Sequence, residues 1–184
     1  MLGEMHAHSF ATDPKHLGFV LARYKFVAKM LAGYDKVLEV GCGDCTGAKL
    51  IKPVVGSWLG VDIDPPFEAA DVVKHDAMRS LPGAPYDAIY ALDVLEHIEP
   101  ADESEFLRRI WVASGVAIIG SPSLESQPFA SELSKKYHVN CKTEEGLRES
   151  LRKWWRNVFI FGMNDEVLHT GFGPMCHYRL AICV

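Results

Sequence analysis

The chain has 184 residues, of which 48% are hydrophobic and 23% charged, the proportions of a soluble globular domain with a full core. Its formal net charge of −5 argues against a nucleic-acid partner, because nucleic-acid-binding proteins present a basic face. No apolar run approaches the roughly 20 residues of a membrane helix, so we expect no membrane partner.

Targeting signals and cysteine usage point to a reducing compartment. The N-terminus lacks a basic region followed by an apolar one, so it does not resemble a secretory signal. The five cysteines are an odd number without a disulfide-like framework, which predicts a cytoplasmic setting. Cys42 and Cys45 could form a redox or metal pair. We favour two small residues in a tight turn, because no second pair completes a tetrahedral zinc site.

Helices and strands alternate along the chain. Asp13 and Pro14 open the first helix as N-cap and first helical residue, and Gly33 ends it. The spacing of apolar residues predicts the later elements in this order: strand 36–40, helix 47–51, strands 57–63, 72–75 and 86–92, a short helical segment 93–98, helix 103–113, strand 115–120, an irregular segment 121–142, helix 143–155, strand 157–162, loop 163–177 and strand 178–184.

This order predicts an α/β fold with a mostly parallel sheet. Strands 157–162 and 178–184 have no helix between them, so they should pair antiparallel. We find no repeat, low-complexity tract or linker, and we therefore expect a single domain over residues 1–184.

The most informative motif is Val-Leu-Glu-Val-Gly-Cys-Gly at 37–43, a buried strand that ends in two glycines. Such a turn at the carboxyl end of a parallel strand lets backbone amides approach a ligand closely. Asp62 follows about twenty residues later, where ribose hydroxyls are bound, and Asp76 follows the next strand. Glu39 would repel pyrophosphate, and Thr46 replaces the third glycine of the dinucleotide fingerprint. A ligand with an amino group, a sulfonium and no phosphate therefore fits better than NAD.

Four ordered motifs resemble those of class I S-adenosylmethionine-dependent methyltransferases. They are Val-Leu-Glu-Val-Gly-Cys-Gly-Asp, Gly-Val-Asp-Ile-Asp, His-Asp-Ala-Met-Arg-Ser-Leu-Pro and Tyr-Asp-Ala-Ile-Tyr-Ala-Leu-Asp-Val-Leu-Glu-His-Ile, within about residues 36–98. The resemblance implies a Rossmann-like seven-stranded sheet with its last strand antiparallel and helices on both faces. It also implies S-adenosylmethionine as cofactor, with these contacts: Glu39, Gly41, Cys42 and Gly43 at the methionine portion, Asp62 at the ribose, Ile63 in the same site, Asp76 and Ala77 at the adenine, and Leu92 beside the methyl sulfonium.

The C-terminal half carries a more specific resemblance. Gly-Ser-Pro-Ser-Leu-Glu-Ser-Gln and Met-Asn-Asp-Glu-Val-Leu-His-Thr-Gly-Phe are similar to bacterial methyltransferases of surface-polysaccharide biosynthesis. This resemblance implies a small-molecule acceptor, such as a sugar or a sugar conjugate. The alternative is a catalytically silent module that binds the same cofactor. The sequence leaves open whether oxygen, nitrogen or carbon accepts the methyl group, and what the oligomeric state is.

Methyl transfer to a hydroxyl mainly requires positioning of the acceptor and also benefits from a general base. His97, His138 and His169 are the candidates for this base. His138 falls in segment 121–142, and His169 follows strand 157–162, whose end should face the cofactor rim. Each of these two could instead be a surface loop residue.

Asp93, Glu96 and His97 fall at i, i+3 and i+4 on one helical face. A related group, the quinone-biosynthesis O-methyltransferases, binds a divalent metal with a Glu-x-x-Glu-His form of this motif. Here the shorter Asp93 stands first. We favour a helix cap at Asp93 with Glu96 closing a capping box, and expect no metal. Arg23 and Tyr24 could reach the cofactor's carboxylate, or be a solvated and a core residue.

Overall fold

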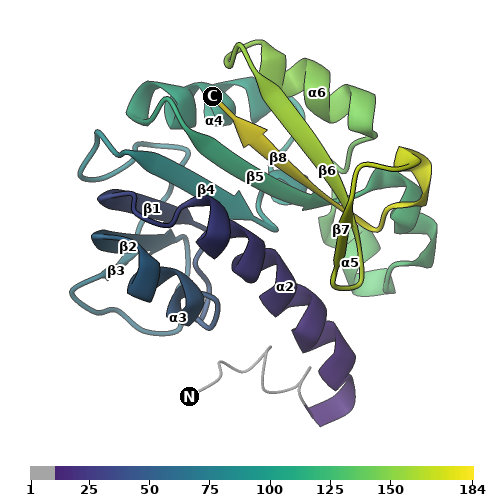
Figure 1. Cartoon of the computed structure of the whole chain (residues 1–184), viewed down its shortest axis with the longest axis horizontal. Helices are drawn as coiled ribbons and strands as arrows, with labels where there is room; N and C mark the ends of the chain where they lie inside the picture. Colours follow the sequence, from purple (N-terminus) through teal and green to yellow (C-terminus); the bar gives the residue numbers. More distant parts are fainter. Residues whose placement is uncertain (1–10) are drawn as a thin grey trace.

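The computed structural model describes residues 11–184, which form one eight-stranded sheet with helices on both faces (Figure 1). The strands are β1 (Lys36–Val40), β2 (Ser57–Asp62), β3 (Val72–Lys74), β4 (Ala88–Leu92), β5 (Ala117–Pro122), β6 (Val158–Asn164), β7 (Val167–His169) and β8 (Tyr178–Cys183). Their order across the sheet is β3-β2-β1-β4-β5-β8-β6-β7. The N-terminal residues on which the expectation of no secretory signal depends lie outside the described part.

The sheet is mostly parallel, as the sequence predicts. Strands β1 to β5 pair in parallel. β8 lies antiparallel between β5 and β6, so β6 again runs in the direction of β1. The predicted antiparallel pairing of the last two long strands is confirmed. The eighth strand is β7, which pairs with β6 inside the segment predicted as a loop and is only three residues long.

Helices α2 (Pro14–Met30) and α3 (Ala48–Ile51) pack on one face of the sheet. Helices α4 (Glu103–Ala113) and α6 (Glu144–Arg152) pack on the other. In Figure 1, α2 and α3 are drawn below the strands, whereas α4 and α6 are drawn above them. Both faces of the sheet are therefore covered, as in other parallel sheets.

Each face has its own hydrophobic core. Val37 of β1 packs in the same core as Val27 of α2, and both are fully buried. Leu38, the next residue of β1, packs in the opposite core with Ile110 of α4. Because successive strand residues face opposite, buried sides, β1 is apolar apart from Glu39 and the exposed Lys36.

The predicted start of two helices is confirmed. The Asp13 side chain accepts a hydrogen bond from the backbone N–H of His16 at the start of α2. The Thr143 side chain accepts one from Gly146 at the start of α6. Both bonds satisfy an N–H that the helix itself leaves free.

The segment after β4 differs from its prediction. It is a single 3₁₀ turn, η2 (Leu95–His97), which follows Val94, and no side chain caps it. The predicted capping box of Asp93 and Glu96 is therefore wrong. Asp93 has a φ of +55°, a left-handed conformation, and its carboxylate bonds to a side chain of α2 instead.

Segment 121–142 also holds more structure than predicted. It contains η3 (Leu124–Phe129) and α5 (Glu132–Tyr137), whose first N–H groups bond to the side chains of Ser123 and Ser131. These short polar helices show no apolar periodicity, which is why the sequence predicts an irregular segment. The remaining short turns are η1 (Lys52–Val54) and η4 (Gly173–Met175). Within residues 11–184, no helix has both the length and the apolar character needed to cross a membrane.

Candidate cofactor and acceptor site

A cavity of about 390 Å³ opens at the carboxyl ends of β1, β2 and β4. This volume lies within the usual range of small-molecule sites. The cavity is lined by Val40, Gly41, Val61, Asp62, Ile63, His75, Asp76, Ala77, Met78, Asp93, Val94, His97, Ile98 and Phe106. The lining therefore includes five of the predicted cofactor residues and one of the predicted catalytic histidines.

Two of the lining carboxylates are fixed by backbone amides. Asp62, at the end of β2, accepts hydrogen bonds from the N–H of Gly43 and of Asp64, both at 2.9 Å. Asp76 accepts one from the N–H of Met78, also at 2.9 Å. An ionised carboxylate offers about four acceptor positions. Asp62 can therefore still accept bonds from two ligand hydroxyls.

The lining residues as a set fit S-adenosylmethionine. Three of the lining residues are aspartates, and no lysine or arginine lines the cavity. A cationic ligand without phosphate suits such a lining. Ile63 lines the cavity yet is 68% exposed, so its apolar surface is free to be covered by a flat heterocycle.

Gly41 begins the turn after β1 and lines the cavity with its backbone. Its φ is +78°, and an added Cβ would lie 2.3 Å from Cγ2 of Val94. Its N–H and that of Cys42 both donate to the carbonyl of Val61, at 2.8 and 3.1 Å, which holds the turn against β2. A side chain at this position is strained by the backbone and by lack of space.

We therefore predict that Gly41→Ala lowers the free energy of unfolding by at least about 1–2 kcal/mol, the cost of the left-handed conformation alone. Urea unfolding measures this loss. The matched control is Gly115→Ala, because an added Cβ there meets nothing within 4 Å and its φ is not positive. Equal stability of the two variants would contradict the prediction.

Glu39 does not line the cavity. Its carboxylate is 1% exposed and accepts hydrogen bonds from the hydroxyls of Tyr24 and Tyr90, at 2.8 and 2.7 Å. Burial raises the pKa of Glu39 to about 8, although the two tyrosine bonds act in the opposite direction. Tyr24 also packs so closely on Gly47 that an added Cβ there would lie 2.2 Å from its ring. The structure therefore places Glu39 where it supports the glycine turn, and its predicted contact with the cofactor stays a prediction.

Three other predicted cofactor residues, Cys42, Gly43 and Leu92, adjoin the cavity without lining it. Cys42 is buried, and Cys45 donates its N–H to the Cys42 carbonyl at 2.9 Å and its thiol to the Gly43 carbonyl at 3.8 Å. Both cysteines are free thiols, in keeping with a tight turn. Leu92 is buried at the end of β4, packed against Gly120.

Arg23 of α2 reaches the end of β4 at the edge of the cavity. Its Nη1 donates to both carboxylate oxygens of Asp93, each at 2.9 Å. Its guanidinium carbon lies 3.8 Å from the centre of the Tyr178 ring. The side chain is mostly buried, so the expectation of a solvated arginine is wrong. These three residues join α2, β4 and β8 beside the cavity.

His97 and His138 lie next to each other, with ring centroids 5.1 Å apart. Nδ1 of His97 bonds to the carbonyl of Tyr137, and Nδ1 of His138 bonds to Oε1 of Gln127, both at 3.0 Å. Because a carbonyl oxygen only accepts, both Nδ1 atoms carry the proton and both Nε2 atoms keep a lone pair. Burial and the neighbouring His97 lower the pKa of His138, which favours its neutral form.

His169 is placed differently. Its Nε2 bonds to Oδ1 of Asn164 at 2.8 Å, and its Nδ1 accepts from the N–H of Gly171 at 3.2 Å. Both ring nitrogens are therefore in use within the β6–β7 hairpin, and the residue does not line the cavity. The structure brings His97 and His138 together and leaves His169 without a free nitrogen.

Glu96 is a buried carboxylate that sequence reasoning treated only as a cap or a motif residue. It is 0% exposed, and neither oxygen has a hydrogen-bond partner among the described residues. Burial raises the pKa of Glu96 well above its usual value, the charge of Asp93 adds to this effect, and Arg23 and the Ser121 hydroxyl oppose it. Such a group requires either a proton or a cation beside it.

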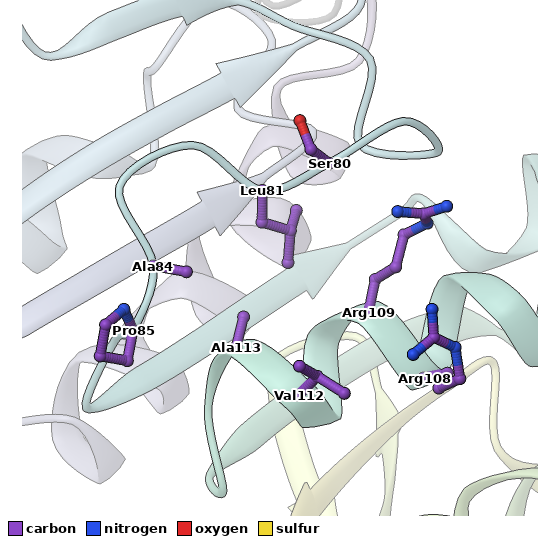
Figure 2. A pocket seen from close by; sticks show the side chains of 8 residues that line it. All are labelled: Ser80, Leu81, Ala84, Pro85, Arg108, Arg109, Val112 and Ala113. Carbon is purple, nitrogen blue, oxygen red and sulfur yellow. The ribbon is translucent and has the colours of Figure 1, made fainter.

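Figure 2 shows a second hollow, of about 410 Å³, between the loop at 80–85 and α4. Arg108 and Arg109 flank it, and both pair with Glu105, at 2.7 and 2.9 Å. None of the predicted cofactor or catalytic residues lines this hollow. The predicted cofactor and catalytic residues that line a cavity therefore all line the first one.

Comparison with known proteins agrees with this geometry. Residues 38–113 match the family model of a methyltransferase domain. A probable S-adenosylmethionine-dependent methyltransferase of Mycolicibacterium smegmatis is 30% identical over 113 residues, which are 54% of this chain and 42% of the relative. The chain thus spans less than half of that relative's length.

Solved structures share the fold. An S-adenosylmethionine-dependent methyltransferase from Archaeoglobus fulgidus superimposes with a TM-score of 0.74 at 20% identity, covering 98% of this chain and 99% of that one. The small RNA methyltransferase HEN1 superimposes with a TM-score of 0.70 at 16% identity, covering 87% of this chain and 24% of that one. Residues 38–113 therefore match a methyltransferase domain, and the chain has the fold of these methyltransferases, as the sequence predicts.

Proposed function

We propose that this chain transfers a methyl group from S-adenosylmethionine to a hydroxyl of a small molecule, of the sugar or sugar-conjugate class. The observation that carries the proposal is the cavity at the strand ends, where Asp62, Ile63 and Asp76 combine fixed carboxylates with an open apolar surface. Sites of this kind lie at the same edge in other α/β sheets.

Different lining residues can contact different parts of the cofactor. Asp62 has free acceptor positions for the ribose hydroxyls. Ile63 and Ala77 offer apolar surface to the adenine, and Asp76 can accept from its amino group. The Gly41 backbone, which lines the cavity, can adjoin the methionine portion. When bound, S-adenosylmethionine supplies an electrophilic methyl group on its sulfonium.

The acceptor side of the site contains a base. Methyl transfer is an in-line displacement, in which the acceptor oxygen bonds to the methyl carbon as the carbon–sulfur bond breaks and S-adenosylhomocysteine leaves. The hydroxyl proton must pass to a base. His97 is the best placed, because it lines the cavity and its Nε2 keeps a lone pair. His138, whose ring adjoins it, is the second candidate.

The charge of the cavity bears on the class of acceptor. Asp62, Asp76 and Asp93 all line it, and the chain carries a net charge of −5, so this field does not favour a polyanionic acceptor, although Arg79 pairs with Asp76 and Arg23 with Asp93. A neutral hydroxyl compound fits this field better. Oligonucleotides belong in the acceptor panel as the competing class, because the structural neighbour HEN1 is a small RNA methyltransferase.

The first test is calorimetric titration with S-adenosylhomocysteine. We expect micromolar binding, weakened at least about tenfold by Asp62→Ala, because hydrogen bonds to charged groups contribute roughly 1.5–3 kcal/mol. The matched control is Asp64→Ala, whose carboxylate lies outside the cavity, is 84% exposed and pairs with Lys74. Equal binding by the two variants would show that the assigned ribose contact is wrong.

A catalytically silent module is the alternative function. It would bind S-adenosylhomocysteine as tightly but release no product from a panel of sugars, sugar conjugates, catechols and oligonucleotides. Turnover of one class that His97→Asn reduces, with unchanged affinity for S-adenosylhomocysteine, supports the enzyme. Turnover of oligonucleotides alone would overturn the small-molecule proposal.

A further inference from the structure

A group of ligand atoms adjoins the cofactor cavity, and the proposed cofactor contacts do not use it. Glu96 offers a carboxylate oxygen, and His97 and His138 each offer a ring nitrogen. All three atoms lie within 4.8 Å of one another. Two of the residues belong to the turn η2 after β4, and the third follows α5, about forty residues later in the chain. Chain folding alone brings them together.

The backbone clamps the two segments to each other. The N–H groups of Val139 and Asn140 both donate to the carbonyl of Glu96, at 2.8 and 3.0 Å. The carbonyl of Tyr137 accepts from Nδ1 of His97 at 3.0 Å. The three ligand residues are therefore held in a fixed arrangement, as a metal site requires.

Both imidazoles are prepared to act as ligands. The Nδ1 proton of His97 goes to a backbone carbonyl, and that of His138 goes to the amide oxygen of Gln127. Histidines that bind metals generally donate the other ring N–H to such an acceptor, which fixes the tautomer and orients the ring. The free lone pairs are on Nε2.

The carboxylate is the second, independent observation. Both oxygens of Glu96 are buried without a hydrogen-bond partner among the described residues. A buried carboxylate left without partners costs several kcal/mol unless it holds a proton or has a cation beside it, and a divalent cation bound by the neighbouring imidazoles would supply that charge. Arg23, the cation at this edge, has Nη1 on Asp93, not on Glu96.

We propose that Glu96, His97 and His138 bind a first-row divalent cation such as Mn²⁺, Fe²⁺, Co²⁺ or Zn²⁺. Two imidazoles and one carboxylate suit these ions and leave coordination positions open, whereas Mg²⁺ and Ca²⁺ prefer oxygen ligands. Asp93 is not one of the three grouped residues, and each of its carboxylate oxygens is bonded to Arg23. This proposal differs from the expectation of no metal that the sequence suggested.

The site has a consequence for the acceptor, which depends on the proposed function. His97 lines the cavity, so the open positions lie beside the place where an acceptor hydroxyl would be held. A hydroxyl bound to a divalent cation has a lower pKa and loses its proton more readily. The cation would then take over the activation otherwise assigned to a histidine.

The test is metal binding by tag-free, chelator-treated protein in a His6→Asn/His8→Asn background, which excludes the N-terminal histidines. Calorimetry with Mn²⁺, Co²⁺ and Zn²⁺ should show about one site per chain, and the Co²⁺ form should gain visible absorption bands. Glu96→Gln and His138→Asn should each weaken binding at least tenfold, the usual cost of disturbing a metal site.

Two controls make the outcome decisive. His75→Asn removes a histidine that lines the cavity outside the cluster, and it should leave metal affinity within about threefold. Asp93→Asn should weaken metal binding less than Glu96→Gln does, because Asp93 acts on Glu96 through its charge and is not one of the grouped ligands. A loss in Asp93→Asn as large as that in Glu96→Gln would overturn the three-residue assignment. Metal binding that survives both Glu96→Gln and His138→Asn, or is absent from the parent protein, would overturn the site.

Titration of the same samples with S-adenosylhomocysteine separates this proposal from the proposed function. Tight cofactor binding without metal binding would refute the metal site and leave the methyltransferase assignment intact. Cofactor affinity retained in Glu96→Gln and His138→Asn, together with an unchanged circular dichroism spectrum, would show that lost metal binding reflects lost ligands and not misfolding.

Discussion

Replacing Glu39 by glutamine should remove a large pH dependence from the stability of this protein. Burial raises the pKa of Glu39 to about 8, so the folded state favours the protonated carboxyl. The resulting stabilisation is complete below pH ~4.5, where the unfolded chain also holds the proton. It is lost as the pH rises through about 8. Over that window the parent protein should lose roughly 4 kcal/mol relative to the variant.

Glutamine is the matched substitution, because it imitates the neutral acid between Tyr24 and Tyr90. Urea unfolding of both proteins from pH 4.5 to 8.5 gives the difference and removes the contribution of other titrating groups. We expect the variant to be the more stable protein at pH 8.5. A difference that does not change with pH would mean that Glu39 is ionised in the folded state.

Arg179 should be the most costly single side chain to remove. It is 1% exposed and donates to the carbonyls of Lys142 and Gly173, at 2.9 and 3.1 Å. It also pairs with Glu125 at 2.9 Å. Arg179→Met leaves a largely buried carboxylate and two carbonyls without their donor, a loss of about 3–5 kcal/mol in unfolding free energy. Chemical denaturation measures it.

The double variant Arg179→Met/Glu125→Leu should regain part of the loss, since no charge is then left unpaired. Lys74→Met is the control for an ion pair in solvent, because Lys74 and Asp64 are both exposed, and it should produce no measurable change. If Arg179→Met and Lys74→Met were equally stable, the hydrogen bonds and ion pair of Arg179 would not stabilise the fold as described.

The sequence predicts the central strands well because they are buried on both faces. Strand β1 is apolar at every position but Glu39 and the exposed Lys36, so its pattern is unambiguous. The sequence does not reveal β7, because three residues with exposed or half-buried side chains carry no recognisable alternation. It likewise does not reveal η3 and α5, which begin at serine caps and bury none of their residues.

Residues close together in the sequence motifs were easier to place than residues brought together by folding. Asp62 and Asp76 follow predicted strands, and both line the cavity. Glu39 lies on a predicted strand, but its partner Tyr24 belongs to a helix whose docking no local pattern encodes. His138 reaches His97 only because the main chain after α5 bonds to η2.

The position of β8 has a consequence for how the chain folds. This strand comes last among the eight, yet it pairs with β5 on one side and β6 on the other. During synthesis the first five strands can therefore assemble early, whereas β6 and β7 have no edge to join until β8 has been made. The pairing of β5 with β8 joins segments that are far apart in the chain, and contacts of this kind form slowly during folding. Until β8 has been made, the edge of β5 that will pair with it is unpaired and open to contact with other chains.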